Sequence, residues 1–349
     1  MSAEKAEIQG CEEQLKLLIK KLNLIEKKLI LEDDPTRTLK YEIDKDETEL
    51  KIAEVKKKLV ELKATIAPDL TPTHQKDRVA LNEHHKYTCD RIKQDVRFHK
   101  LYKAAKEGSK AHFFYLYGLD VQSHEGLFNR FAYALEGRLM DYMYDDFESE
   151  VQAIKVILTP ALAQDEEYDK QQILSRLFAS LNVSYDRFEP LLEKNLANLY
   201  ENSPVVNNLS GEDYVCVMLG VSSDDWDPEM IPELARWFIT VFCKCDLPDD
   251  APTFLFFLGI IFEEEDPNIQ KQVKDTVENS NLIFGIPELK EVKLSDLKKW
   301  FREYSFIKNN TTERDQLIQE RFGDASQFDM EEVEIRLLQI IDEYNAGRI

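Results

Sequence analysis

The chain has 349 residues, of which 43% are hydrophobic and 10% aromatic, enough apolar material for a folded core and, by length, for roughly two domains. Asp and Glu outnumber Lys and Arg by 67 to 45, which gives a formal net charge of −22. This balance argues against a nucleic-acid partner and against an anionic membrane surface, because both require clustered basic side chains.

The sequence carries none of the signals of secretion or membrane insertion. The N-terminal stretch has no apolar core of the signal-peptide kind, and no apolar run approaches the roughly 18 residues that a membrane span needs. We therefore expect a cytoplasmic protein. The five cysteines are few and odd in number, which argues against a disulfide framework. Cys243 and Cys245 lack a second pair of ligands nearby, so neither a metal nor another cofactor is predicted.

The first 66 residues are predicted to form a separate helical module. Apolar residues recur in alternating steps of three and four, as in the seam of a coiled coil. In the first half the seam comprises Ile8, Cys11, Leu15, Leu18, Leu22, Ile25 and Leu29, and in the second half Ile52, Val55, Leu59, Leu62 and Ile66. An acidic break that ends at Pro35 favours two helices folded into an antiparallel hairpin, with a continuous dimerising rod as the alternative.

This helical module is the expected site of partner binding. The residues assigned to the contact are Leu15, Leu18, Leu22, Ile25, Leu29, Leu59 and Leu62. A proline-containing linker is predicted over 67–75, followed by a main domain over 76–304 and a helical segment over 305–349.

The main domain alternates short apolar runs with amphipathic segments. Strands are predicted over 111–118, 153–158, 214–220 and 253–261. Helices are predicted over 76–107, 126–141, 167–182, 186–201, 227–243, 295–304, 311–322 and 329–345. The predicted fold is therefore α/β: a mostly parallel sheet flanked by helices, with the N-terminal antiparallel hairpin ahead of it and helices at the C-terminus.

The loop after the first strand has the position of a phosphate-binding loop but not its residues. It begins at Gly118 like the pattern G-x4-G-K-[ST], yet the next three required positions hold Ser123, His124 and Glu125. Serine restricts the backbone, histidine is mostly neutral at pH 7, and a carboxylate repels phosphate. We predict a degenerate phosphate loop formed by these residues and Gly126, with no catalytic group.

Other chemistry-bearing residues are interpreted as structural. Asp224 and Asp225 follow the third strand and are expected to cap the helix that begins near Pro228, rather than to bind a metal. A hydrolase that uses these two acids is a third, remaining alternative.

Two further groups lie on the predicted helix over 76–107. Asp90, Arg91 and Gln94 are expected to share a helix face and to make an interdomain or ligand contact. His84 and His85 are expected to be solvated.

Several short motifs together resemble one known family. They are HFFYLYGLDVQSHEGLFNRFAYAL, the preceding Cys89–Gln94, and the later Trp226–Phe242, Phe254–Phe262 and Val292–Phe301. Over roughly residues 80–304 the chain is similar to the inactive STAND domains. The resemblance implies a P-loop NTPase-like fold that has lost its phosphate and Mg²⁺ residues.

The resemblance also implies a function. It suggests a non-catalytic adaptor, scaffold or sensor in a prokaryotic defence or signalling system, recruiting a protein partner, either an effector or a sensor, through the helical module. A homo-oligomer is compatible with the sequence. The alternative is a nucleotide-binding switch with weak ATP or GTP affinity and little or no hydrolysis.

Overall fold

The computed structural model describes residues 79–349 except 106–108, 145–146, 161, 163–164, 186–193, 265, 279–281 and 309, together with scattered positions between 10 and 58. The chain forms two compact units, 1–78 and 79–349.

In the first unit, the described positions between 10 and 58 are helical. The seam residues Cys11, Ile25 and Val55 are buried, Leu18 is half-buried, and Leu17, which is not part of the seam, is 69% exposed. The remaining contact residues (Leu15, Leu22, Leu29, Leu59 and Leu62) and the linker over 67–75 lie outside the described residues. The hairpin and the rod therefore both stay predictions.

The second unit is built on a five-stranded parallel sheet with the order β2-β3-β4-β1-β5. Its strands are β1 (Ala111–Leu119), β2 (Ala153–Leu158), β3 (Tyr214–Ser222), β4 (Thr253–Phe262) and β5 (Phe284–Gly285). The four predicted strands and the α/β class are confirmed. The fifth strand was missed because two residues carry no periodicity.

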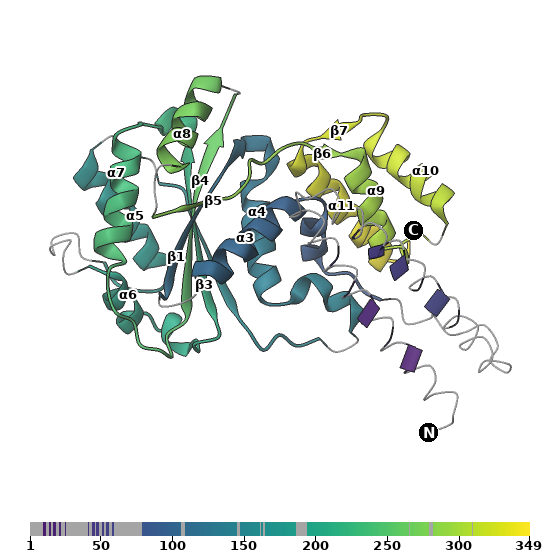
Figure 1. Ribbon diagram of the computed structural model, residues 1–349, viewed down its shortest axis with the longest axis horizontal. Coiled ribbons are helices and arrows are strands. Elements are labelled where there is room, and N and C mark those ends of the chain that lie inside the picture. Colours follow the sequence, from purple (N-terminus) through teal and green to yellow (C-terminus); the bar gives the residue numbers. More distant parts are fainter. Residues whose placement is uncertain are drawn as a thin grey trace. The chain divides into compact units, whose positions relative to one another are not determined.

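Helices cover both faces of this sheet (Figure 1). One face carries α3 (Ile92–Ala105) and α4 (His124–Leu135), and the opposite face carries α5 (Glu166–Ser180), α6 (Leu196–Asn202) and α7 (Met230–Trp237). α8 (Pro267–Glu278) precedes β5. Short helical turns η5 (Val206–Asn208) and η6 (Ser223–Asp225) flank β3. Helices on both faces explain why the central strands are apolar without alternation.

Aromatic side chains fill the core under α3 and α4. The rings of Phe98 and Phe131 stack at a centroid distance of 4.4 Å, and Phe131 stacks on Phe257 of β4 at 5.6 Å. All three are almost completely buried. This packing fixes α4, and with it the loop that precedes the helix, against the centre of the sheet.

Three predicted helices are divided in the structure. The segment 76–107 contains a 3₁₀ helix, η1 (Glu83–Thr88), and then α3, with a break between them. The segment 126–141 contains α4, which begins two residues earlier, and the 3₁₀ helix η3 (Arg138–Met143). The left-handed backbone of Gly137 separates these two, with φ of 72°. The segment 227–243 contains α7 and a π-helical turn, η7 (Phe238–Phe242).

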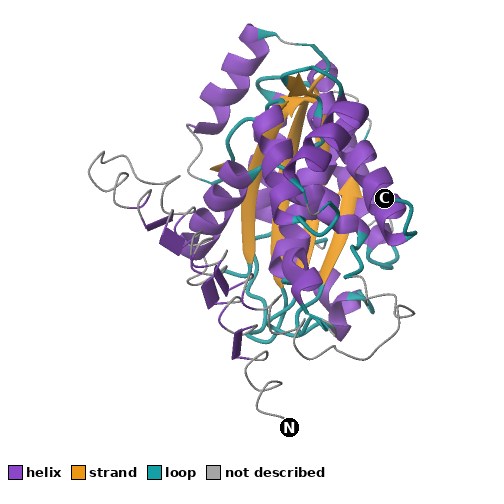
Figure 2. Ribbon diagram, turned by 90° about the vertical axis from the view of Figure 1, so that its right-hand side faces the viewer, coloured by secondary structure: helices purple, strands orange, loops and turns teal. Residues whose placement is uncertain are grey.

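The C-terminal part forms a second hydrophobic core. It comprises β6 (Val292–Lys293), α9 (Leu294–Glu303), α10 (Thr311–Phe322), β7 (Gln327–Phe328) and α11 (Met330–Asn345), and β6 pairs antiparallel with β7. Among the described residues, the buried members of this cluster come from 81–89 and 292–344. We call it the C-terminal core. Figure 2 shows helices lying in front of the strands on this side.

Candidate functional site

Strand β1 lies between β4 and β5 in the sheet, and the loop that follows it starts at the carboxyl end of the strand. The chain leaves the strand at Leu119, makes the 3₁₀ turn η2 (Asp120–Gln122), and enters α4 at His124. Gly118 is required at the start because Leu289 passes beside it: a Cβ at 118 would lie 2.7 Å from the Leu289 Cβ. The loop therefore has the place in the sheet at which α/β proteins bind ligands.

Ser123 caps α4. Its backbone is left-handed, with φ of 54°, and its hydroxyl accepts a hydrogen bond from the backbone N–H of Gly126 at 3.1 Å. Serine is a favoured N-cap residue because its hydroxyl oxygen satisfies one of the free N–H groups of the first turn. The first turn of α4 is thus capped from within the loop.

The position in front of this helix terminus is filled by a carboxylate from the same chain. Both carboxylate oxygens of Glu334, on α11, lie 2.9 Å from the Ser123 hydroxyl, which donates to them. A Cβ on Gly126 would lie 1.9 Å from Oε1 of Glu334, so the glycine is what lets the carboxylate come so close to the helix backbone. The Glu334 carboxyl group therefore lies beside the Ser123 cap and the first turn of α4.

The environment of Glu334 favours its neutral form. Burial raises the pKa of this carboxyl to about 7, although the hydrogen bond from Ser123 and the charges of Lys86 and Arg91 act in the opposite direction. Glu331, one turn earlier on α11, adds a further upward contribution. The carboxyl is therefore close to half-ionised near neutral pH.

A second contact joins the loop to the start of α11. The side-chain amide of Gln122 donates to the carboxylate of Asp329 at 2.9 Å. Gln122 is buried, and Asp329 immediately precedes the helix. Together with the Ser123–Glu334 pair, this contact holds the first turn of α11 against the loop.

Arg91 supports the loop from the other side. Its guanidinium, only 1% exposed, donates to the backbone oxygens of Gln122 at 2.9 Å and of Lys290 at 2.5 Å. The amide of Gln94 donates to the backbone oxygen of Glu288 at 2.9 Å. Both side chains thus hold backbone segments of the same unit in place, and the predicted interdomain or ligand contact stays a prediction.

The expectation that Asp90, Arg91 and Gln94 lie on one helix is wrong. Asp90 and Arg91 precede α3, and both have left-handed backbones, with φ of 55° and 60°. Non-glycine residues adopt this conformation only where their surroundings enforce it. The buried hydrogen bonds of the Arg91 guanidinium are that constraint, and they break the helix at a point where the sequence has neither glycine nor proline.

The residues at the lysine and hydroxyl positions of the pattern lie on the first turn of α4. His124 is 4% exposed, and burial lowers its pKa to about 4, against the effect of the Ile260 backbone. It is therefore uncharged at pH 7. Glu125 is exposed beside it. Further carboxylates, Asp120 and Glu331, lie close enough to interact electrostatically. The open side of the loop is consequently acidic.

Asp224 and Asp225 do not cap the helix that follows β3. They form η6, and the residue that accepts from the N–H groups of Glu229 and Met230 is Asp227, at 2.9 and 2.7 Å. The capping residue is therefore Asp227 and not Asp224 or Asp225, because α7 begins at Met230, later in the chain than predicted.

The expectation that His84 and His85 are solvated is also wrong. They are 5% and 0% exposed, and their Nε2 atoms lie 3.0 and 2.8 Å from the carboxylate of Asp141. The amide of Asn82 also donates to this carboxylate at 2.9 Å. Burial alone would raise the pKa of Asp141, but the hydrogen bonds from the two histidines hold it well below its usual range.

The ligand atoms of His84, His85 and Asp141 lie within 4.8 Å of one another. In the described part of the chain, this is the one cluster of potential metal-ligating side chains with such spacing. The Nδ1 of His85 accepts from the backbone N–H of Asn82 at 3.0 Å, so in the neutral ring Nε2 carries the proton. The Nε2 of His84 faces a backbone oxygen, that of Arg138, as well as the carboxylate. These protonated nitrogens suit a hydrogen-bonded network and not a metal centre.

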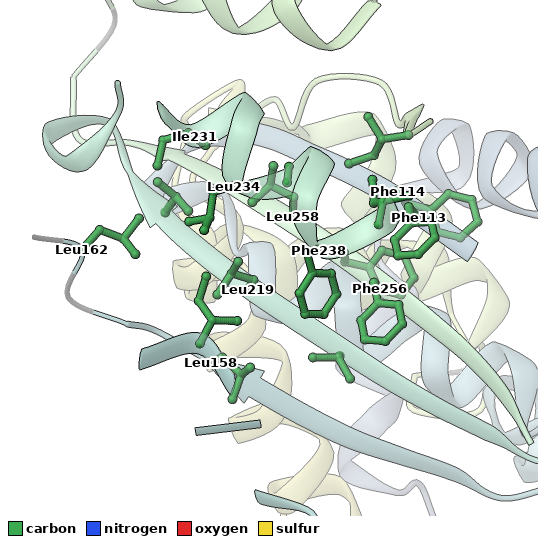
Figure 3. Close-up of a pocket in the computed structure, with 17 residues that line it drawn as sticks. Phe113, Phe114, Leu158, Leu162, Leu219, Ile231, Leu234, Phe238, Phe256 and Leu258 are labelled. Carbon is green, nitrogen blue, oxygen red and sulfur yellow. The ribbon is translucent and has the colours of Figure 1, made fainter. Parts of the chain in front are cut away.

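An apolar cavity lies on the other face of the sheet, under α7 (Figure 3). Its volume is about 60 Å³, and side chains from β1, β3, β4 and α7 line it. The lining includes Leu219, Leu234, Phe238 and Phe256. A cavity of this size and polarity is a packing defect, and no polar group converges on it.

All five cysteines have free thiols, and no helix in the part of the chain that the structure describes has the length and hydrophobicity required to cross a membrane.

Comparison with known proteins places the chain in one family. A search of curated protein sequences finds no relative. Among solved structures, the chain is weakly similar to the Walker-type ATPase of Pyrococcus abyssi, with 12% identity, 80% of this chain and 71% of that chain covered, and a TM-score of 0.33. It is also similar to the Aeropyrum pernix ORC2 protein in its ADPNP–ADP complexes, with 11% identity, 80% and 70% coverage and a TM-score of 0.41. A family model described as inactive STAND matches residues 86–260, half of the chain, and the protein therefore belongs to the inactive STAND family.

Proposed function

We propose that this protein is a non-catalytic adaptor or scaffold of a prokaryotic defence or signalling system, acting in the cytoplasm. The N-terminal helices recruit a protein partner, and the inactive STAND domain carries no nucleotide chemistry. The observation that supports this most directly is the carboxyl group of Glu334, which packs against Ser123 and Gly126 at the first turn of α4.

The charges around the loop support the same proposal. His124 and Glu125 stand where a phosphate loop has lysine and a hydroxyl, and burial keeps His124 uncharged at pH 7. The lost charge-assisted hydrogen bonds are worth about 1.5–3 kcal/mol each, and each 1.4 kcal/mol is about tenfold in affinity. Repulsion from Glu125 and Glu334 adds to that loss, so ATP affinity falls by several powers of ten.

Calorimetric titration of the full chain with ATP and with GTP, each with Mg²⁺, tests this proposal. We expect no binding at micromolar strength. The variant Glu334→Ala is the informative control, because we expect it to remain unable to bind while His124 and Glu125 are unchanged. Micromolar binding by the wild-type protein would favour a nucleotide-dependent switch instead.

Recruitment by the N-terminal helices is tested with two single substitutions in the first helix. Ile25 is buried, whereas Leu17 is 69% exposed. In co-purification with the product of a neighbouring gene, Ile25→Glu should abolish capture and Leu17→Glu should leave it intact. Capture that survives both Ile25→Glu and removal of residues 1–66 would contradict the proposed role of this module.

A further inference from the structure

The C-terminal core and the sheet are separate hydrophobic bodies. The buried members of the C-terminal core come, among the described residues, from 81–89 and 292–344, whereas the clusters around the sheet contain the strands and α3 to α8. No shared apolar cluster therefore joins these two bodies among the residues described. They are joined instead by ring contacts of Tyr133, on α4, with His84 and Tyr87, on η1, and by hydrogen bonds.

The polar contacts at the loop involve α11. Ser123 donates to Glu334, and Gln122 donates to Asp329. A third joint lies at η1, where the guanidinium of Arg130, on α4, donates to the backbone oxygen of Tyr87 at 2.8 Å. Glu334 is half-buried, and its carboxyl group packs against the loop and Gly126, so it gains exposure to water if α11 moves away.

Backbone strain is concentrated at the same joints. The described non-glycine residues with left-handed backbones are Asp90, Arg91, Ser123 and Asn182, and the first three lie at the loop or next to it. Asp90 and Arg91 connect η1, which belongs to the C-terminal core, to α3, which belongs to the sheet. Such strain persists only while the surrounding contacts enforce it, and at Ser123 those contacts include the hydrogen bond from its hydroxyl to Glu334 on α11.

We propose that the degenerate loop has become a receptor for the carboxyl group of Glu334, and that the protonation state of this one side chain controls how firmly the C-terminal core docks on the sheet. The inference rests on the proposed function, because the loop can bind a side chain of the same protein only if no nucleotide occupies it. Docking is tight when the carboxyl is neutral and looser when it is ionised.

The groups that face Glu334 leave it as the titrating acid near neutral pH. From η1 it faces Lys86 and Tyr87, and from the segment before α3 it faces Arg91. From the loop it faces Ser123, and from its own helix Glu331. Glu125, on α4, acts on its neighbours Glu331 and Tyr87. Burial raises the pKa of Tyr87 well above its usual range, so the phenol keeps its proton.

The direction of the pH effect follows from the two states of Glu334. Its pKa is about 7 when docked and about 4.5 when exposed. Below the lower value the carboxyl is neutral in both states and docking is tightest. As the pH rises between the two values, only the released state ionises, and docking weakens about tenfold for each pH unit. Above about pH 7 the weakening is complete.

Hydrogen exchange of the full chain between pH 5 and pH 8, with labelling times scaled to the intrinsic exchange rate, tests the proposal. In the wild-type protein, amides of 330–340 and 120–128 should lose protection as the pH rises to 7, by on the order of a hundredfold in total, and then level off. Glu334→Gln should stay protected throughout, because its amide cannot ionise.

Two further variants complete the test. Glu332→Gln, at an exposed position on the same helix, should keep the wild-type pH dependence. Ser123→Gly removes the hydrogen bond that favours the ionised form of Glu334, so the loss of protection should occur at higher pH than in the wild-type protein. Glycine is chosen because it tolerates the left-handed backbone at this position. Equal pH dependence in Glu334→Gln and wild type, or its loss in Glu332→Gln, would overturn the proposal. Because the assay contains no nucleotide or partner, its result concerns only the docking of the C-terminal core. A negative result would leave the proposed scaffold function intact, and failure of the scaffold function would leave the docking proposal intact.

Discussion

The hydroxyl of Ser123 lies 2.9 Å from both carboxylate oxygens of Glu334, a residue 211 positions later in the chain. This pair joins the loop after the first strand to the last helix. It places the carboxyl group of Glu334 beside the first turn of α4.

The approach of Glu334 to the backbone depends on Gly126. A Cβ at this position would lie 1.9 Å from Oε1 of Glu334 and 2.3 Å from the Ser123 hydroxyl. We therefore expect Gly126→Ala to destabilise the protein by about 1–3 kcal/mol, as overpacking does. In the Glu334→Ala background the same change should cost less, with a coupling energy of about 0.5–3 kcal/mol in a double-mutant cycle of urea denaturation. Strict additivity would show that the two groups do not touch.

Gly118 is constrained by a different neighbour. A Cβ there would lie 2.7 Å from the Cβ and 2.9 Å from the backbone oxygen of Leu289, neither of which can rotate away. Gly118→Ala should cost about 1–3 kcal/mol in the free energy of unfolding. Gly259→Ala is the matched control in a neighbouring strand, since the nearest atom to a Cβ would be 3.7 Å away. It should stay within about 1 kcal/mol of wild type, and an equal cost for both variants would contradict this account.

The carboxylate of Asp141 accepts from His84, His85 and Asn82 in a buried site. Asp141→Asn removes the carboxylate that these groups face and should lower the free energy of unfolding at pH 7 by about 1.5–3 kcal/mol.

The pH dependence of this effect has a definite sign. Because the pKa of Asp141 is lowered in the folded state, its contribution is present at neutral pH and is lost as the pH falls below about 4. The gap between wild type and Asp141→Asn should therefore close in acid. Asp315→Asn, at a half-exposed ion pair with Lys298, should cost less than about 1 kcal/mol at any pH. A gap that persists unchanged at pH 3 would rule out the ionised carboxylate as its source.

The apolar cavity under α7 has room for one more methylene group. Val217 lines it, whereas Val215, two residues earlier on the same strand, is fully buried in the neighbouring core. Val217→Ile should raise the free energy of unfolding by up to about 0.8 kcal/mol. Val215→Ile should lower it by about 1–3 kcal/mol, because no space is available there. Thermal denaturation of both variants measures the difference, and the same sign for both would exclude the cavity as the cause.

Local sequence signals predicted most of the sheet and the place of the loop. The runs Phe113–Tyr117 and Phe254–Phe257 are apolar without alternation, which is typical of strands covered on both faces, and they pair in the centre of the sheet. The change from such a run to an amphipathic segment located the loop between Gly118 and Gly126. The substituted positions, Ser123 to Glu125, were likewise visible in the sequence.

The contacts that define the site could not be predicted in this way. His84 and His85 gave no sign of burial because their partner, Asp141, is more than 50 positions away. Arg91 breaks a helix through hydrogen bonds to loops that follow it in the chain, at a point with no local stop signal. Glu334 is one of 67 acidic residues, and nothing in its neighbourhood distinguishes it.

The sequence by itself determined the α/β architecture and the family, because hydrophobic periodicity and motif spacing are local properties of the chain. Only the tertiary structure decided what the loop holds in place of a phosphate. That choice required α11 to fold back on α4, and the free energy of a buried carboxylate depends on the hydroxyl, the glycine and the charges that surround it in space.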